Sequence, residues 1–339
     1  MFFKQRIFFV LSSIFRGFGT KIECSCEIKN MNLKKPILYF VLSSFTFGIL
    51  LNSCKDKKDP SPLEQTTPVE TKREEKVSKP KKELMRYQAL EFPENKKGKD
   101  SAMAAFLSTY SKEERYLILA LNRLDQKNRW RAQTLIIPES FEEDFLKYTP
   151  FPLQVDLLKE VEKLVVFSYS YHAFGVFENG KLVKWGPSSL GKKDSPTKKG
   201  LHFTNWKKKL AISTVDSDWK LPYNFNIHNT LGIGWHQYDL PGFHASHSCL
   251  RLLEADAKWL YEWADMWVLT NQGREVKAKG TPVLVYGESD FESKPWLELL
   301  KDPKANEISE EELTSELSPL LEEILKEQKN SNAVRSGQE

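Results

Sequence analysis

Cysteine is scarce in this chain, which has 4 cysteines among 339 residues. Cys24 and Cys26 lie near the N-terminus, and the other two are Cys54 and Cys249. If the mature chain begins at Cys54 and that thiol carries lipid, Cys249 is the only free thiol and a disulfide framework is excluded. A lone thiol is an oxidation liability in an oxidising compartment, so its presence there favours a chemical role over an inert buried one.

The chain also lacks a large excess of charge of either sign. Its 50 Lys and Arg residues and 46 Asp and Glu residues leave a net charge of +4. This is too small to indicate a nucleic-acid partner. With 40% hydrophobic and 28% charged residues, the composition is that of a globular protein of one large or two small domains.

No apolar run is long enough for a confident membrane-spanning helix. The run from Pro36 to Leu51 follows two lysines and is shorter than the roughly 20 residues that a bilayer requires. A basic start, a short apolar segment and a small residue before the cleavage site are typical of a secretory signal peptide. This signal peptide would begin naturally at Met31. Leu51-Asn-Ser-Cys54 resembles a bacterial lipobox. We therefore predict a signal region over 1–53, lipid attachment at Cys54 and an envelope lipoprotein of the inner or outer membrane; an ordinary N-terminal membrane anchor is the alternative.

The next two segments differ sharply in composition. Residues 54–85 are rich in Lys, Glu, Asp, Pro, Thr and Ser, cannot bury enough apolar surface to fold, and are predicted to form a disordered tether. Residues 86–162 are predicted to form a small N-terminal module of helical or α+β type. Ser111-Lys-Glu-Glu114 predicts a helix start, and Thr134–Pro138 predicts a strand. Leu119–Pro138 resembles the second half of a lysin-motif module, which binds glycan strands of peptidoglycan; a simple support domain is the alternative.

Residues 163–287 are predicted to be mainly β. Short β-branched and aromatic runs, such as Leu164–Tyr171 and Ala173–Phe177, alternate with turn signals, and Glu254–Trp267 predicts one helix. Many short strands with one helix favour an antiparallel sandwich or barrel. Residues 288–339 are predicted to form an acidic helical tail that Pro319 divides, and whose leucine stripe caps this chain rather than docking a partner.

The stretch from Gly232 to Leu252 concentrates the reactive side chains of the chain. It contains His236, His244, His247 and Cys249. On an extended strand His247 and Cys249 would point to the same face, and a neighbouring base lowers the pKa of a thiol. This spacing predicts a Cys–His pair. A metal site made of these four residues is the alternative, because thiolate and imidazole are zinc ligands; we predict no metal and no cofactor.

Four segments together resemble the L,D-transpeptidase catalytic domain (YkuD) family: Ser195–Phe203, Ile227–Thr230, Ser246–Leu252 and Gly280–Val283. The resemblance spans residues 163–287 and implies a β-sandwich or barrel with one catalytic-domain helix. It also implies a Cys249 nucleophile that acts on peptidoglycan stem peptides and a His247 base. His228 matches the upstream histidine of the family, with His236 as the second candidate, and Arg251 matches the arginine beside the nucleophile.

Two residues depart from the family pattern, Asn229 and Ser248, which stand where the family usually has glycine. A serine in the left-handed region would cost roughly 1–2 kcal/mol. Its backbone amide would survive as an oxyanion donor, with Ser246 beside it. The departures leave open a decayed, non-catalytic peptidoglycan-binding lipoprotein.

The chemistry of the motif allows two reactions. A Cys249 thiolate would attack a peptide carbonyl to form an acyl-enzyme, and an amine of another stem peptide would resolve it in a transpeptidase. Water would resolve it in a carboxypeptidase. The sequence does not choose between amine and water, and it leaves the oligomeric state open.

Overall fold

The computed structural model describes residues 82–213 and 216–337. The signal region, Cys54 and nearly all of the predicted tether lie outside these residues. Within the part that is described, no helix is long and apolar enough to cross a membrane.

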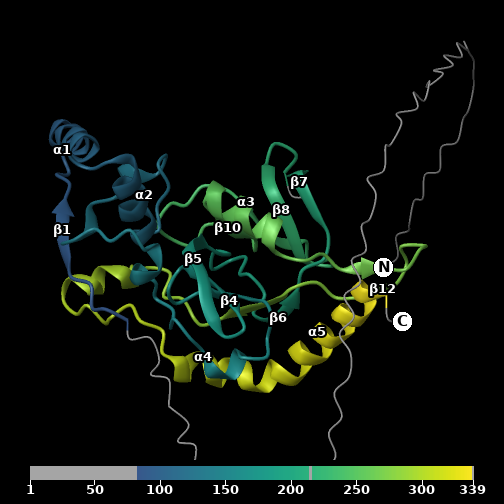
Figure 1. Cartoon of the computed structure of the whole chain (residues 1–339). Helices are drawn as coiled ribbons and strands as arrows, with labels where there is room; N and C mark the ends of the chain where they lie inside the picture. The colour runs from purple at the N-terminus through teal and green to yellow at the C-terminus, as the bar shows by residue number, and fades with distance from the viewer. Residues whose placement is uncertain (1–81, 214–215, 338–339) are drawn as a thin grey trace, which may run out of the picture. The chain divides into compact units, whose positions relative to one another are not determined.

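A strand–helix–helix–strand unit begins the described chain (Figure 1). Its elements are β1 (Tyr87–Glu91), α1 (Lys96–Thr109), α2 (Lys112–Leu121) and β2 (Thr134–Pro138). Strands β1 and β2 pair antiparallel, and the capping box at Ser111 starts α2 as the sequence predicts. The segment that resembles a lysin motif comprises the end of α2 through β2. The sequence did not identify the preceding half, β1 and α1, and the lysin-motif resemblance stays a prediction.

A nine-stranded mixed sheet forms the centre of the chain. Its spatial order is β6-β13-β3-β4-β5-β10-β9-β8-β7. Only β3–β13 and β9–β10 pair parallel. The strands are β3 (Leu164–Ser168), β4 (Ala173–Glu178), β5 (Lys181–Ser189), β6 (Gly200–Phe203), β7 (Lys207–Ile212), β8 (Lys220–His228), β9 (Ile233–Gln237), β10 (Leu250–Leu252) and β13 (Pro282–Tyr286).

The sheet is curled, and a short link joins its two edge strands. Only Thr204–Trp206 separates one edge strand, β6, from the other, β7. In that link Asn205 donates its N–H to the carbonyl of Asn226 at 2.8 Å, and Asn226 donates its own to Trp206 at 3.0 Å. The predicted mainly β fold is confirmed, and its form is a single curled mixed sheet, or half-barrel.

One hydrophobic cluster packs the sheet against α3 (Glu254–Trp263). It includes Phe167, Trp235, Leu250 and Leu260. The predicted helix is therefore present, but it ends at Trp263 and leaves Trp267 outside, because the chain turns there into β11 (Val268–Leu269), which pairs with β12 (Val276–Ala278). Short 3₁₀ turns occur at Arg129–Arg131, Phe145–Tyr148 and Asp156–Leu158.

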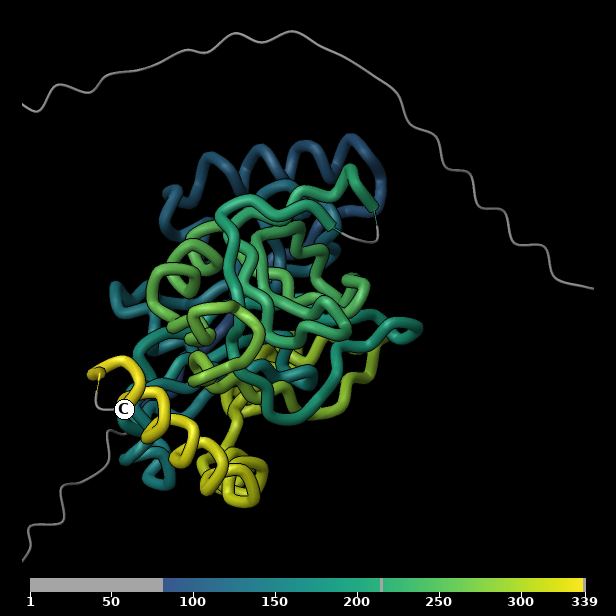
Figure 2. Tube along the Cα trace, turned by 90° about the vertical axis from the view of Figure 1, so that its right-hand side faces the viewer, coloured from purple at the N-terminus to yellow at the C-terminus, as the bar shows by residue number. Residues whose placement is uncertain are grey.

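The C-terminal segment packs on the unit that contains the sheet. It comprises a 3₁₀ turn (Pro295–Leu300), α4 (Glu310–Leu317), a second turn (Ser318–Leu320) and α5 (Leu321–Ser336), so Pro319 lies at the predicted division. Leu313, Leu317 and Ile324 are fully buried. In Figures 1 and 2, α1 and α5 lie at opposite ends of this unit.

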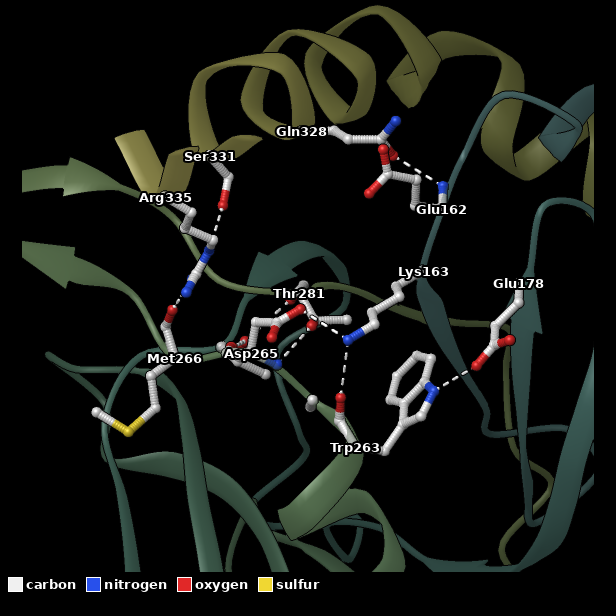
Figure 3. Close-up of polar contacts among 12 residues, drawn as sticks. Glu162, Lys163, Glu178, Trp263, Asp265, Met266, Thr281, Gln328, Ser331 and Arg335 are labelled. Carbon is white, nitrogen blue, oxygen red and sulfur yellow. Dashed lines mark hydrogen bonds and ion pairs between the residues drawn. The ribbon is translucent and has the colours of Figure 1, made fainter. Parts of the chain in front are cut away.

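Polar contacts hold α5 to the segments next to β3 and α3 (Figure 3). The Gln328 side-chain oxygen accepts the N–H of Glu162 at 2.8 Å, and Arg335 donates to the carbonyl of Met266. Below the helix, Lys163 forms an ion pair of 2.9 Å with Asp265. The leucine stripe therefore covers this chain's own core, and the polar side of α5 ties strand β3 to the end of α3.

Candidate active site

A cavity of about 130 Å³ lies between the β7–β8 hairpin and the N-terminal end of β10. It brings together two histidines, His236 and His247, with Ser246, Cys249 and Arg251. The rest of its wall is largely apolar and amide-bearing: Trp206, Ala211, Ile212, Ser213, Trp219, Leu221, Asn224, Asn226, Leu231, Gly232 and Tyr238. His228 is not part of this lining.

The pairing of β9 with β10 places three of these side chains. The two strands run parallel, with Arg251 opposite His236 and Leu250 opposite Trp235. Leu250 and Trp235 are fully buried in the core. Because strand side chains alternate, Cys249, Arg251 and His236 share the other face, which is the wall of the cavity.

The Cys249 thiol is only partly exposed and lies 4.0 Å from the carbonyl of Gly232. Burial raises its pKa, and the Gly234 backbone and the positive charge of Arg251 oppose this increase without reversing it. The prediction that the His247 spacing lowers the thiol pKa is therefore wrong for the resting site. The Cys249 thiol is therefore neutral in the folded protein near neutral pH.

His247 is exposed and does not lie on a strand. The residue between it and the thiol, Ser248, has φ +79°, so the chain bends there and the argument from strand alternation is wrong. The imidazole lies beside Trp219, with ring centroids 5.0 Å apart. Both His247 and Cys249 nonetheless line the cavity.

His236 is buried, and one hydrogen bond determines which of its ring nitrogens carries the proton. Its Nδ1 lies 3.0 Å from the carbonyl of Gln237, and because a carbonyl can only accept, Nδ1 carries the proton. Nε2 is then left with a free lone pair. Burial lowers the pKa of His236 to about 4, with the Gln237 contact acting against this and the Arg251 charge adding to it. At neutral pH His236 is an uncharged proton acceptor on the wall of the thiol cavity.

His228 ends β8 outside the cavity. Its Nε2 lies 3.3 Å from Lys198 Nζ, and its Nδ1 accepts a hydrogen bond from the N–H of Leu231 at 3.4 Å. The neighbouring Asn229 accepts hydrogen bonds from Asn205 and from Trp206, each at 3.2 Å, and so orients an indole of the cavity wall. The structure brings His236 rather than His228 into the cavity.

Arg251 and Ser246 hold the loop that carries the thiol. Arg251 donates to the carbonyl of Ala245 at 3.0 Å, and its guanidinium lies 4.6 Å from the ring centroid of Tyr238. Ser246 is buried and donates its hydroxyl to the carbonyl of Cys249. Both side chains therefore act on the conformation of the loop as well as facing the cavity.

The segment before that loop is anchored from the N-terminal unit. Asp125, just beyond α2, accepts the N–H of Leu240 at 2.6 Å and donates its own N–H to the Leu240 carbonyl at 3.1 Å. His244 accepts the N–H of Leu190 at 2.9 Å through Nδ1, and its Nε2 donates to the carbonyl of Tyr169 at 2.9 Å. Its ring stacks on His172 with centroids 3.7 Å apart.

The alternative of a metal site gains no support. Both ring nitrogens of His244 already bind backbone groups, and Nδ1 of His236 does as well. In residues 82–213 and 216–337, no group of three His, Cys, Asp or Glu side chains is arranged to hold a metal ion.

Ser248 allows a direct test of backbone strain. Its φ of +79° costs a side chain roughly 1 kcal/mol, and its hydroxyl donates to the carbonyl of Ser195 at 3.2 Å, a bond of similar magnitude. Ser248→Gly removes both the strain and the bond, so we expect a free energy of unfolding within about 1 kcal/mol of wild type. Ser248→Ala keeps the strain and loses the bond, and should be about 1 kcal/mol less stable than Ser248→Gly in urea denaturation. Equal stability of the two variants would mean that position 248 is unstrained.

Part of this chain is similar to known proteins. The family model of the L,D-transpeptidase catalytic domain (YkuD) matches residues 162–285. A solved L,D-transpeptidase from Stackebrandtia nassauensis is 26% identical over 38% of this chain and 57% of its own, with a TM-score of 0.32. An L,D-transpeptidase from Mycobacterium tuberculosis H37Rv is 24% identical over 37% and 58%, with a TM-score of 0.30.

L,D-transpeptidase 3 from Mycobacterium tuberculosis, solved with a faropenem-derived adduct, is 23% identical over 37% of this chain and 60% of its own, with a TM-score of 0.30. The chain thus spans under two thirds of the length of these solved structures. No curated protein matches the chain significantly. The family that matches is therefore the L,D-transpeptidase catalytic domain (YkuD), over residues 162–285, a range that contains α3 and all the residues that line the thiol cavity.

Proposed function

We propose that this protein is a peptidoglycan L,D-transpeptidase that forms an acyl-enzyme at Cys249. The observation that supports this most directly is the cavity in which a partly buried thiol, a neutral buried imidazole and a guanidinium meet inside the family-matched segment. A thiol needs a nearby proton acceptor to attack a carbonyl, and His236 and His247 both line the cavity. Arg251 adds a positive charge beside the thiol.

The proposed reaction has two steps. The Cys249 thiol passes its proton to an imidazole as sulfur bonds to a stem-peptide carbonyl carbon, and the N–H groups near 248–249 stabilise the oxyanion. The C–N bond then breaks, the leaving amine takes a proton from a histidine, and a thioester remains. An acceptor amine from a second stem peptide attacks the thioester and releases Cys249.

Muropeptides incubated with the purified protein test this function by mass analysis. Cross-linked dimers would establish transpeptidation, and shortened stems would establish the carboxypeptidase alternative. Unchanged muropeptides, together with cosedimentation of the protein with insoluble peptidoglycan, would identify the non-catalytic binding alternative.

His236 and His228 should differ strongly in their effect on acylation. His236 offers a free Nε2 lone pair to the cavity, whereas His228 lies outside its lining. We expect His236→Gln to slow acylation of Cys249 by about 100-fold or more, because loss of a general base costs that order of rate. His228→Gln should slow it less than about tenfold. Stopped-flow acylation by a carbapenem measures both, and the reverse order would return the upstream role to His228. The acylation rate of His247→Gln, measured in the same way, gives the contribution of His247, the base that the sequence predicts.

Cys54 is proposed to anchor the protein in the envelope through a lipid. Cys54→Ala should leave the signal region uncleaved or release the protein from the membrane fraction, because a short apolar run without acylation holds a membrane weakly. Fractionation with mass analysis of the N-terminal peptide measures this. Normal processing with full membrane retention would contradict the lipobox interpretation.

A further inference from the structure

The surroundings of the thiol cavity carry an unusual excess of positive charge. Residues 206–220 contribute to the cavity wall, and residues 191–199 contact Ser246 and Ser248 beside the thiol. Together these two segments contain eight lysines and three aspartates, a net charge of +5 against +4 for the whole chain. No carboxylate is among the cavity-lining residues, and Arg251 is one of them. The two segments nearest the thiol therefore carry a net positive charge.

Strand pairing places two of these lysines at the cavity. Lys208 on β7 lies opposite Asn224 on β8, and Asn224 lines the cavity. Directly opposed residues project to the same face, so Lys208 extends the cavity wall outward. Lys220 lies opposite Ile212 and directly follows Trp219, both of which line the cavity.

Two other lysines lie near the cavity on the segment between β5 and β6. Lys198 lies 3.3 Å from His228, whose ring accepts the N–H of the cavity residue Leu231. Lys192 donates its backbone N–H to the carbonyl of Ser246 at 3.0 Å, next to the thiol loop. We name Lys192, Lys198, Lys208 and Lys220 the lysine rim; in the described part of the chain none of the four ammonium groups has a carboxylate partner.

We propose that the lysine rim draws carboxylates to Cys249, so that the substrate class is stem peptides with free, ionised carboxylates rather than amidated ones. The choice of stem peptides rests on the proposed function; the attraction of carboxylates does not. A cleft bordered by charge of one sign raises the local concentration and encounter rate of the opposite charge by 10-fold or more at low salt. Salt screens such an attraction over about 10 Å at 0.1 M. An amidated stem peptide of the same shape carries no such negative charge and would not be attracted in this way.

A pair of alkylating agents of nearly equal size tests the attraction without any substrate. Iodoacetate is an anion and iodoacetamide is neutral, and each reaction at Cys249 forms a C–S bond and releases iodide. In the full-length protein, alkylation of the peptide that contains Cys249 is followed by mass spectrometry at about 10 mM and about 500 mM salt, a range over which screening changes strongly. We expect the rate ratio of iodoacetate to iodoacetamide to fall about tenfold between the two conditions.

Matched variants assign the attraction to the rim. Replacing the four rim lysines by glutamine should lower the low-salt ratio to nearly its high-salt value. The control replaces four exposed lysines of α1 and α5, Lys96, Lys97, Lys326 and Lys329, and removes the same charge elsewhere. The ratio should then stay close to wild type. A ratio that is insensitive to salt, or equal losses in both variants, would overturn the proposal.

Turnover of paired stem peptides then tests the substrate class. For tetrapeptide stems with a free or an amidated side-chain carboxylate, kcat/KM should favour the free acid about tenfold at low salt, and the rim variant should lose this preference. Turnover without preference for the free acid would overturn the substrate class and leave the proposed function intact. Absence of turnover with both stems would overturn the proposed function, while the alkylation ratio still decides whether the rim attracts carboxylates.

Discussion

Cys249→Ala is expected to abolish covalent adduct formation completely and to remove all turnover of stem peptides. The alanine has no group that can bond to a carbonyl carbon, and Cys249 is the only cysteine in the described part of the chain. Cys249→Ser keeps a hydroxyl of similar size, but a hydroxyl is a far weaker nucleophile without a strong base. The acylation rate of Cys249→Ser should be at least 1,000-fold below that of wild type, on the order of the loss when a catalytic nucleophile is removed. Intact-mass analysis after incubation with a carbapenem, followed by peptide mapping, gives the readout.

Folding must be excluded as the cause of any such loss. The thiol is partly exposed and makes only a long contact with Gly232, so we expect both variants to unfold within about 1 kcal/mol of wild type. A wild-type adduct that maps to a residue other than Cys249, or an adduct that persists in Cys249→Ala, would refute the assignment of the nucleophile.

Stability should fall steeply as the pH drops from 7 to 5. His236 and His244 are buried, and burial lowers the pKa of each to about 4. In the unfolded chain each titrates near 6.5. Between these values the unfolded state binds a proton that the folded state excludes, so stability is fully present above pH 6.5 and is lost as the pH falls toward 4. At pH 5 the loss is about 2 kcal/mol for each of the two residues.

The environment of His244 makes this loss specific. Protonation of His244 at Nδ1 would remove the lone pair that accepts the Leu190 N–H. It would also place a positive charge on a ring whose centroid lies 3.7 Å from that of His172. Burial lowers the pKa of His172 as well, with His244 and the buried Arg123 adding to the effect. No acidic side chain contributes to the pKa shift of His172 or of His244.

Urea denaturation at pH 7 and pH 5 measures the effect, since most carboxylates remain ionised at pH 5. His244→Gln can still accept from Leu190 and donate to Tyr169, but it cannot titrate. Its loss of stability between the two pH values should be about 2 kcal/mol smaller than that of wild type. A wild-type protein as stable at pH 5 as at pH 7 would show that these histidines are accessible to protons in the folded state.

The sequence by itself determined the features that depend on neighbouring residues. The β character of residues 163–287 follows from short β-branched and aromatic runs, and the helix start at Ser111 follows from a capping box that the structure contains. Cys249 stood out because its motif is contiguous. The division of the C-terminal helices follows from Pro319, which cannot continue a helix.

The tertiary structure alone decided which groups line the cavity of the thiol. Both His228 and His236 lie upstream, and periodicity does not reveal which strand pairs beside β10. The parallel pairing of β9 with β10 sets His236 opposite Arg251, whereas His228 ends β8 opposite Ile233 and is not among the cavity-lining residues. The direction of the Cys249 pKa was equally beyond the sequence, because burial depends on residues distant in the chain. The spacing of His247 and Cys249 predicts that both lie on one extended strand, but the chain bends between them at Ser248. The positive φ of Ser248 is visible only in the folded backbone.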